Sequence, residues 1–405
     1  MPPPYRSIPL RKSDLPTRFK PTQYLRFSEL PATTKLVPHI RSIAWSATGV
    51  YLAQAVGSTI RVWNTDRDGR PGGDSKTRPS AGVEVKNAHG IGETVEKVVF
   101  CPTREGVLAS VGSDGKLRLW DFGGGGGGMG VAGAPAGPKA GATTTAGGGA
   151  AATHAVGECN IGDAGWSLTW HPSGDLVLVG RQDDVVQAVT LQQASSTDAT
   201  NTGSRPLYTL TPHDATPSRT HPPRSRNLNA LAFSHPGTEL LCTTGDGRVQ
   251  IYSWPDLHHL YTLAAHTHGT HSVAHSPSGN YIAVGGADAL LTLWDTRSLH
   301  CVHALPEHEK GVREVSFSWD GAFVCAGSGK ESREVQGTGA KGDEEKGNAG
   351  GLRFWHADTG EVVHVVETAR AVSCVAWHPW RYWVAYAGEE GGLRVLGVGG
   401  GVGGG

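Results

Sequence analysis

Short apolar runs rich in Val, Ile, Leu and Trp recur along the chain, and each run is bounded by Gly, Asp, Ser or Pro. No long segment places apolar residues at spacings of three and four, which is the period of an amphipathic helix. Short apolar runs separated by turn residues are typical of β-strands. The pattern therefore predicts an all-β protein built from many short strands.

The strands recur as one unit, made of an apolar strand, a Ser-Pro or His-Pro turn with Gly, a second strand, a tight turn and a third strand. Seven copies align, some loosely, and their first strands begin at Ile40, Val95, Trp166, Leu228, His271, Val312 and Val372. Repeats of this kind cannot bury their apolar faces alone and stack into arrays.

One position in the third strand tests this alignment. It is occupied in the seven copies by Trp63, Trp120, Val189, Tyr252, Trp294, Trp355 and Leu396. Six residues earlier, four copies carry an aspartate, namely Asp114, Asp183, Asp246 and Asp288. Tyr252 and Trp294 are 42 residues apart, which matches a WD-repeat propeller blade of roughly 40–45 residues.

The seventh copy stops at its third strand and passes into Gly-rich sequence after Leu396, whereas earlier copies are followed by a candidate fourth strand. The missing strand is supplied if Gln23–Leu30, ahead of the first copy, pairs with the last one. A ring closed in this way has no free end to fray. The sequence thus predicts a seven-bladed WD40 β-propeller over residues 23–397, closed by an N-terminal strand.

Several segments are too polar or too rich in Gly to join a packed core. They are a Gly/Ala-rich insertion at about 122–152, a charged insertion at about 331–350, polar insertions near 66–80 and 192–227, and a Gly-rich tail at 398–405. Residues 1–22 are predicted to be a basic flexible arm. A solvated tail is its commoner explanation, and contact with RNA or an acidic partner surface is the alternative.

Composition narrows the function. Lys plus Arg (36) nearly equals Asp plus Glu (37), so the strongly basic footprint of a nucleic-acid-binding domain is missing. The six cysteines are scattered without a CxxC pair, which indicates a reducing compartment, the cytosol or the nucleus. No stretch resembles a signal peptide or a membrane span, so we expect a soluble intracellular protein with no membrane contact.

The second copy carries the hydrogen-bonded network that typifies WD repeats, in which a turn Asp accepts from a loop His and a Trp N–H finds an acceptor. We interpret as structural, and not as catalytic or ligand-binding, the residues at these positions in several copies: His89, Ser110, Asp114, Trp120, Asp183, Asp246, Asp288 and Trp294.

Catalytic and metal-binding patterns fail on inspection. The Gly-Ser-Gly-Lys330 stretch resembles a phosphate loop, but it lacks the upstream Gly and Glu331 follows the Lys. The histidines at 266, 268, 271 and 275 have no preformed cage on a propeller strand. The Asp183-Asp184 pair has no opposing acid or base. The sequence predicts no enzyme activity, no cofactor, no metal site and no small-molecule substrate.

Five stretches resemble, in the same order, the WD-repeat subunit of the THO complex, and they are Val179–Val189, Gly247–Leu257, Gly279–Asp295, Val312–Gly321 and Ser373–Ala387. At the Trp position of the third strand, the Trp-Asp dipeptide survives only at Trp120 and Trp294, and the long insertions depart from the family. The resemblance implies a nuclear scaffold docked on large helical subunits of the transcription–export (TREX) machinery, supporting mRNP assembly and mRNA export. It implies that mRNA is reached through partners or through the basic arm.

The alternative is a free-standing WD40 module that recognises a short peptide, such as a histone tail or a degron. In either case, the candidate contacts with a partner are turn and loop residues that have no assigned structural role. They are Arg181, Asp184, Arg313, Trp380 and Arg381. Exposed Trp and Arg often anchor interfaces, although packing within blade seven explains Trp380 equally well. The docking face and the stoichiometry do not follow from the sequence.

Overall fold

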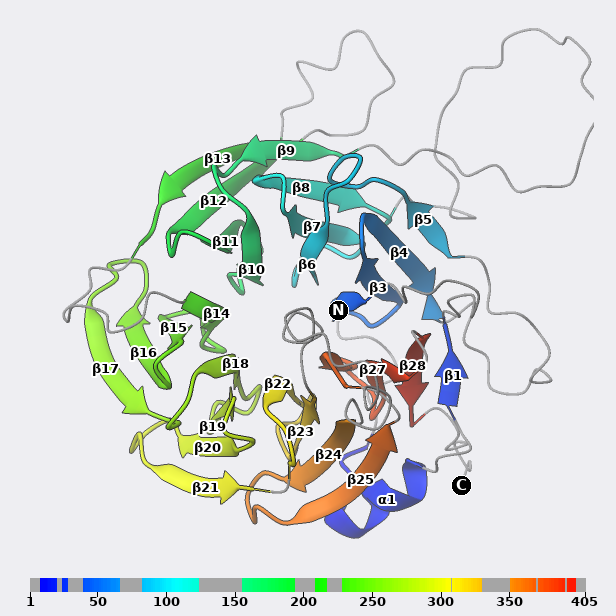
Figure 1. The fold of residues 1–405 in the computed structure, drawn as a ribbon, viewed down its shortest axis with the longest axis vertical. Coiled ribbons are helices and arrows are strands. Elements are labelled where there is room, and N and C mark those ends of the chain that lie inside the picture. The colour runs from blue at the N-terminus through cyan, green and yellow to red at the C-terminus, as the bar shows by residue number, and fades with distance from the viewer. Residues whose placement is uncertain are drawn as a thin grey trace, which may run out of the picture.

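A computed structural model of the chain describes residues 8–19, 24–27, 39–65, 82–123, 155–193, 208–216, 228–306, 308–329, 350–368, 371–389 and 392–397. These residues form seven four-stranded antiparallel sheets, which stand like blades around a central channel (Figure 1). The predicted all-β, seven-bladed propeller is confirmed. The Gly/Ala-rich insertion, most of the charged and polar insertions and the Gly-rich tail lie outside the described residues.

The first three blades each run from an inner strand to an outer one in chain order. Blade one contains β2 (Ile40–Trp45), β3 (Tyr51–Val56), β4 (Thr59–Asn64) and β5 (Val83–Val85). Blade two contains β6 (Val95–Phe100), β7 (Val107–Gly112), β8 (Lys116–Asp121) and β9 (Gly157–Asn160). Blade three contains β10 (Gly165–Trp170), β11 (Leu176–Arg181), β12 (Val186–Gln193) and β13 (Tyr208–Asp214).

Blades four to six follow the same order. Blade four contains β14 (Leu228–Phe233), β15 (Glu239–Thr244), β16 (Arg248–Ser253) and β17 (His259–Ala264). Blade five contains β18 (Thr270–His275), β19 (Tyr281–Gly286), β20 (Leu291–Asp295) and β21 (Cys301–Leu305). Blade six contains β22 (Val312–Phe317), β23 (Phe323–Ser328), β24 (Gly350–His356) and β25 (Val362–Thr368).

Blade seven joins the two ends of the ring. It contains β26 (Cys374–Trp377), β27 (Val384–Glu389) and β28 (Gly392–Leu396), and its outer strand is β1 (Tyr24–Arg26). Strands β1 and β28 pair antiparallel, with Leu25 opposite Val395. The closure predicted from Gln23–Leu30 is therefore confirmed, with a shorter strand than the sequence indicated.

In every blade, the residue at the Trp position of the third strand pairs with an apolar residue of the second strand. Trp120 lies opposite Leu108 and Trp355 opposite Val324. All six residues of β7 and all six of β23 are buried. Because each blade buries both faces against its neighbours, the core is continuous around the channel.

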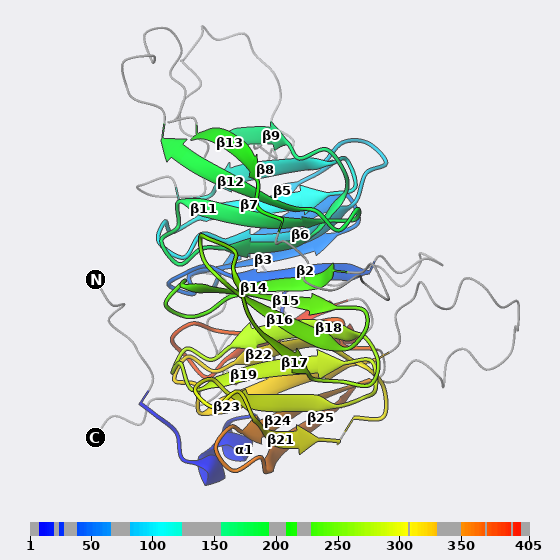
Figure 2. The same cartoon turned by 90° about the vertical axis from the view of Figure 1, so that its left-hand side faces the viewer.

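Part of the N-terminal arm packs on the propeller. A short 3-10 turn, η1 (Lys12–Asp14), and a one-turn helix, α1 (Leu15–Arg18), lie against β25 at the edge of blade six (Figures 1 and 2). Leu15 and Phe19 are fully buried, and the Phe19 ring stacks on Phe354 at 4.9 Å. Within the predicted flexible arm of residues 1–22, the side chains of Leu10, Leu15 and Phe19 therefore pack on the core of blades six and seven.

Candidate functional site

Four residues of blade two form a continuous chain of hydrogen bonds. His89 Nδ1 lies 2.7 Å from Asp114 Oδ1, and His89 Nε2 lies 2.8 Å from Ser110 Oγ. Trp120 Nε1 donates to the same Oγ at 2.9 Å. Burial works to raise the pKa of Asp114, but hydrogen bonds from His89 and Arg118 outweigh it and hold that pKa below its ordinary value. Each polar atom is engaged, so the network is suited to fixing the blade and not to chemistry.

Blade five builds the same network with a hydroxyl from another strand. His266 Nδ1 lies 2.9 Å from Asp288 Oδ1, and Trp294 Nε1 donates to Thr292 Oγ1 at 3.0 Å. Thr292 Oγ1 also lies 3.2 Å from His266 Nε2. Its cross-strand neighbour is Val284, which stands where blade two has its serine. The hydroxyl lies on the third strand of blade five, at Thr292, whereas in blade two it lies on the second strand. Sequence reasoning therefore missed Thr292.

The other two aspartates of the predicted network occupy equivalent turns without a histidine partner among their described contacts. Asp183 pairs with Arg181. Asp246 accepts from Thr244 Oγ1 at 2.5 Å and lies 3.6 Å from Arg248. The structure therefore brings together the network of blades two and five but not that of blades three and four.

Asp184 requires a correction. The sequence placed it among the turn and loop residues without a structural role, as a candidate partner contact, but it is only 8% exposed. Its backbone has a φ of +64°, in the left-handed region. This turn directs the carboxylate inward, where Oδ1 accepts the Leu228 N–H at 2.8 Å and ties blade three to the start of blade four.

Blade six has lost the acceptors of this network. His308 and Trp355 are buried with their rings 5.3 Å apart, but both His308 nitrogens and Trp355 Nε1 lack a hydrogen-bond partner in the described part of the chain. Ala326, opposite Arg353, occupies the position of Ser110 in blade two. Burial, with a further contribution from Arg353, lowers the pKa of His308 to about 3.

Ala326→Ser is expected to stabilise the protein. The new hydroxyl would stand between Trp355 Nε1 and the His308 ring, as Ser110 does in blade two, so we expect the free energy of unfolding to rise by about 1 kcal/mol. Urea denaturation of the variant and the parent measures the change. Ala109→Ser is the matched control, because Ala109 is buried in an apolar cluster and its hydroxyl should destabilise. Equal destabilisation by both substitutions would contradict the account of blade six.

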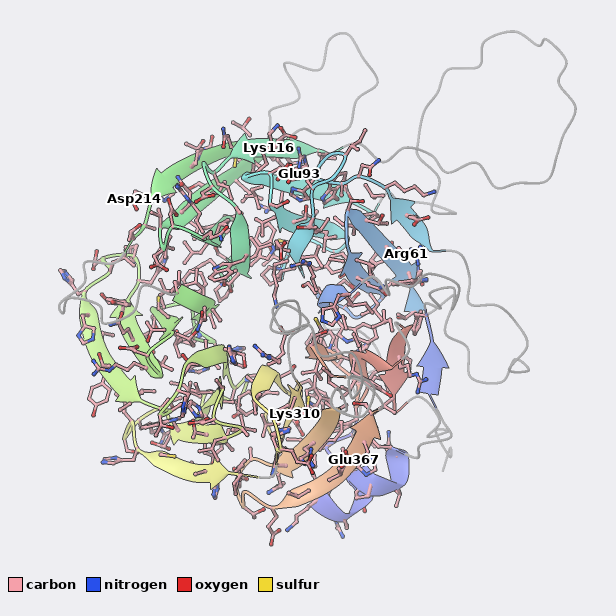
Figure 3. All side chains as sticks on the ribbon, in the orientation of Figure 1. Arg61, Glu93, Lys116, Asp214, Lys310 and Glu367 are labelled. Carbon is pink, nitrogen blue, oxygen red and sulfur yellow. The ribbon has the colours of Figure 1, made fainter. Side chains whose placement is uncertain are left out.

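A ring of polar residues lines the mouth of the central channel. The inner strands of blades one to six each begin with a register shift, typical of a β-bulge. The residues at these shifts, with one from blade seven, line a cavity of about 630 Å³, and they are Arg41, Glu96, Trp166, Asn229, His271, Arg313 and Ser373. Figure 3 shows side chains of the inner strands reaching into this channel.

An ion pair crosses the channel just below the ring. Lys97 Nζ of β6 lies 2.7 Å from Glu314 Oε1 of β22, so it joins blades two and six, which are not neighbours. Burial acts to lower the pKa of Lys97, but the Glu314 carboxylate more than offsets it, and that pKa lies above its usual value. A second pair, Arg41 with Glu96 at 2.5 Å, joins blades one and two. Sequence reasoning did not find either pair.

The remaining candidate contacts fall on two faces of the ring. Arg181 and Arg313 lie on the face of the channel mouth, where Arg313 Nη1 is 3.3 Å from His271 Nε2. Trp380 and Arg381 lie in the turn between β26 and β27, on the opposite face. Trp380 Nε1 donates to the Ala47 carbonyl of blade one at 2.8 Å, so this indole has a packing role between blades.

His378, beside these two residues, is buried in the neutral form. Its Nδ1 accepts the N–H groups of Trp380 and Arg381, both at 3.0 Å, and its ring lies 4.8 Å from Trp45. Burial, with the nearby Arg381 charge, lowers the pKa of His378 to about 3. Protonation of Nδ1 would break both hydrogen bonds.

His378 contributes to the pH dependence of stability, together with His308, whose pKa burial also lowers to about 3. The folded pKa of His378 lies below the unfolded value of about 6.5, so the unfolded chain binds more protons below that pH. The stability is complete above pH ~6.5, is lost as pH falls toward 3, and the loss is about 1.4 kcal/mol at pH ~5.5. We expect His378→Gln to show a smaller decrease between pH ~7.5 and ~5.5 than the parent in urea denaturation. Identical decreases would show that His378 does not contribute to this loss of stability.

An apolar belt follows the outer strands of blades four to six. We use this name for Leu260 and Tyr261 of β17, Val302 of β21, and Val362 and Val365 of β25, which are 36–50% exposed. The three strands succeed one another along the rim (Figure 1). Exposed apolar patches and free strand edges mark protein-binding surfaces.

The outer rim of blades one to three is polar by contrast. Arg61 pairs with Glu84 at 3.0 Å, and Lys116 pairs with Glu158 at 2.5 Å. Figure 3 labels Arg61, Lys116 and Asp214 along this side of the ring. Among the described residues of the outer strands, the large exposed apolar side chains therefore lie in blades four to six.

Neither a metal centre nor a membrane segment emerges from the described residues. Within them, no group of three or more His, Cys, Asp or Glu side chains could hold a metal ion. No helix among them is long and apolar enough to span a bilayer. All six cysteines are described, and they are free thiols.

Comparisons with known proteins agree with the fold. A family model described as "WD domain, G-beta repeat" matches residues 83–121, 257–295 and 299–331. The crystal structure of the Cps50 (Swd1) β-propeller domain of Myceliophteria thermophila superposes with a TM-score of 0.59, covering 91% of this chain and 99% of that one at 15% identity. This likeness concerns the fold alone.

Two curated relatives share the sequence pattern. THO complex subunit 3 of Arabidopsis thaliana is 28% identical over 249 residues, which cover 61% of this chain and 59% of that protein. The WD repeat-containing protein AAC3 of Dictyostelium discoideum is 22% identical over 264 residues, which cover 60% of this chain and 44% of that protein. The chain thus spans between two fifths and three fifths of the length of these relatives.

Proposed function

This chain is a WD-repeat β-propeller similar in sequence to THO complex subunit 3, and from that premise we propose that it is a non-enzymatic scaffold subunit of a THO complex. In this role it supports mRNP assembly and mRNA export in the nucleus. The observation that carries the proposal is the likeness to the Arabidopsis subunit over 249 residues, since the fold alone is compatible with many functions.

The hydrogen bonding and burial of the His and Asp side chains support a role as a scaffold. The histidines and aspartates that could act as acid or base in blades two and five are already hydrogen-bonded to one another and buried. Catalysis needs such groups in reach of a substrate. The alternative of a free-standing peptide-recognition module has less support, because the relative is named as a subunit of a complex.

The apolar belt is the surface that we assign to the large subunits of the complex, with an α-helix as the docking element. The chain itself provides the precedent, because α1 and Phe19 already pack on the outer strand of blade six. Phe19 stacks on Phe354 and contacts the His364 ring at 5.8 Å. A partner helix that presents an apolar face would extend this contact along β21 and β17.

RNA contact through the N-terminal arm has less support than contact through partners. Lys12 is paired with Glu361 of blade six, and residues 8–19 are packed on the propeller. The nearly equal numbers of cationic and anionic side chains also favour an assembly in which other subunits hold the mRNA.

Leu260→Glu is expected to weaken binding to co-expressed large THO subunits about tenfold or more, because it places a charge in the middle of an apolar contact. Titrated pull-down with the purified subunits measures the affinity. Thr209→Glu, on the exposed outer strand of blade three, adds the same charge outside the belt and should bind as the parent does. Equal binding by both variants would remove the belt as the docking surface, and a parent chain that binds no THO subunit would remove the proposed function itself.

A further inference from the structure

The N-terminal arm is attached to the propeller by side chains and not by a strand ladder. In the described part of the chain, no strand of the propeller pairs with η1 or α1. The Leu10 N–H donates to Tyr382 Oη at 3.0 Å, and Lys12 pairs with Glu361. The two side chains of this ion pair are 40% and 57% exposed, so solvent screens it. The arm can therefore leave without unpairing a strand, and β1 closes the ring separately.

The arm covers an aromatic cluster at the edge of blades six and seven. We use the name arm seat for the three rings around Phe19, which are Phe354, His364 and Trp377, at centroid distances of 4.9 Å, 5.8 Å and 5.9 Å. Phe19 and Leu15 are fully buried. Aromatic rings at such distances attract one another beyond the effect of buried area, so the arm seat selects an aromatic side chain.

Docking of the arm leaves a buried polar atom unsatisfied. His364 Nε2 is buried without a hydrogen-bond partner in the described part of the chain. Burial lowers the pKa of His364, and a hydrogen bond with the Phe19 backbone opposes this only in part. Release of the arm removes this cost, because water then reaches the ring. The arm also has to be ordered, since a helix of one turn such as α1 does not persist alone. Both effects oppose docking.

Charges around the arm seat favour a basic segment. Glu361 precedes β25 and Glu367 lies near its end, and their side chains are 57% and 72% exposed. Glu361 pairs with Lys12 of the arm, and Glu367 lies 3.5 Å from Arg353. Residues 8–19 carry three cations against one acid, Asp14. A segment that replaces the arm therefore has to combine positive charge with apolar side chains.

We propose that the arm is a displaceable occupant of the arm seat, and that a basic segment of a partner protein binds there in its place. The segment presents an aromatic side chain to the three rings and an apolar one four residues earlier, as the arm does with Phe19 and Leu15. The tethered arm competes with it at a high effective concentration and so limits binding to partners that are abundant or tight. The site lies beneath the arm, apart from the apolar belt, and it does not rest on membership of a THO complex.

The test uses the full chain and a fluorescein-labelled peptide with the sequence of residues 8–20, followed by fluorescence anisotropy at near-physiological salt. Leu15→Ala with Phe19→Ala in the chain weakens the docking of its own arm. This double variant is expected to bind the peptide about tenfold more tightly than the parent, because the competitor is lost. A peptide that carries Phe19→Ala should bind neither chain.

Two charge reversals place the binding at the arm seat. Glu361→Lys, added to the double variant, is expected to weaken peptide binding about threefold, because it repels Lys12 of the peptide. Glu309→Lys is the matched control, since Glu309 is exposed in the loop before β22, and it should leave the affinity unchanged. Thermal unfolding confirms that each variant is folded.

Hydrogen exchange in the isotope-labelled parent chain tests displacement without any substitution. The Phe19 N–H donates to the Leu15 carbonyl at 3.2 Å in the docked arm. Excess unlabelled peptide is expected to speed exchange of this amide and to leave the amides of β25 unchanged.

The proposal is supported by tighter peptide binding in the double variant, weaker binding after Glu361→Lys alone of the two reversals, and faster exchange at Phe19. It is overturned if the double variant does not bind the peptide or binds it no better than the parent, or if saturating peptide leaves exchange at Phe19 unchanged. A parent chain that sediments as a dimer and that the peptide converts to a monomer would also overturn it, because the arm of a second copy would then be the occupant.

Discussion

Asp114→Ala is expected to lower the free energy of unfolding by about 3 kcal/mol. The Asp114 carboxylate accepts from His89 Nδ1 at 2.7 Å, from Arg118 Nη1 at 2.5 Å and from the Lys116 N–H at 3.2 Å. The His89 side chain is fully buried, so without the carboxylate its Nδ1–H would face only Arg118 Nη1, which is itself a donor and lies 2.9 Å away. The loss therefore includes the cost of an unsatisfied buried group in addition to the hydrogen bonds.

The matched control is Asp246→Ala in blade four. Asp246 stands at the same place in the repeat, but its side chain is 30% exposed and its described partners are Thr244 and Arg248. We expect a loss below about 1 kcal/mol there. Urea denaturation of both variants gives the comparison. Similar losses at the two positions would show that the histidine network is not what makes Asp114 important.

Lys97→Met is expected to destabilise the propeller by about 2 kcal/mol. Removing one partner of a buried ion pair costs about 3–5 kcal/mol because the other charge stays behind. The side chains of Lys97 and Glu314 are about a quarter exposed to the channel, so solvent screening reduces the effect. The Met side chain has nearly the same length, and the substitution therefore tests the charge more than the packing.

A double-mutant cycle separates the pair from its surroundings. Lys97→Met with Glu314→Leu removes both charges, and we expect it to recover most of the stability that Lys97→Met loses. Lys86→Met, at an exposed position next to β5, should change stability little. A double variant as unstable as the sum of the two single variants would contradict the role of the pair as a brace across the channel.

The propeller could be predicted because its information is local and repeated. The period between Tyr252 and Trp294 fixes the size of a blade, and the incomplete seventh repeat indicates the closing strand. The period and the incomplete copy can be recognised even though most copies lack the Trp-Asp dipeptide, because every blade needs an apolar residue at the Trp position of its third strand. Strand β1 confirms the closure with Tyr24–Arg26.

The details of the networks could not be predicted, because they depend on how neighbouring strands and turns are folded. Thr292 replaces a hydroxyl that an alignment expects at Val284, and the exchange is visible only once the strands are paired. Asp183 and Asp184 are adjacent in one turn, and a positive φ at Asp184 decides which carboxylate is buried. Aligning the repeats locates this turn, but it does not show that Asp184 is the aspartate whose side chain is buried.

Two surface features have a signal in the sequence. Leu10, Leu15 and Phe19 are apolar residues within the basic arm, and they dock it on blades six and seven. Leu260 and Tyr261 lie in a segment that the repeat places as an outer strand, where apolar side chains face solvent. The ring of the channel mouth depends on bulges, which no spacing rule for regular strands reveals.

Purification of the tagged chain from its native cells, with nuclease treatment and moderate salt, tests the scaffold assignment most directly. The account predicts that the large THO subunits are recovered with it in near-equal amounts, because a protein interface survives when RNA is digested. Recovery of the chain alone, or together with a ubiquitin ligase or a chromatin enzyme, would contradict that assignment and favour the free-standing peptide-recognition module.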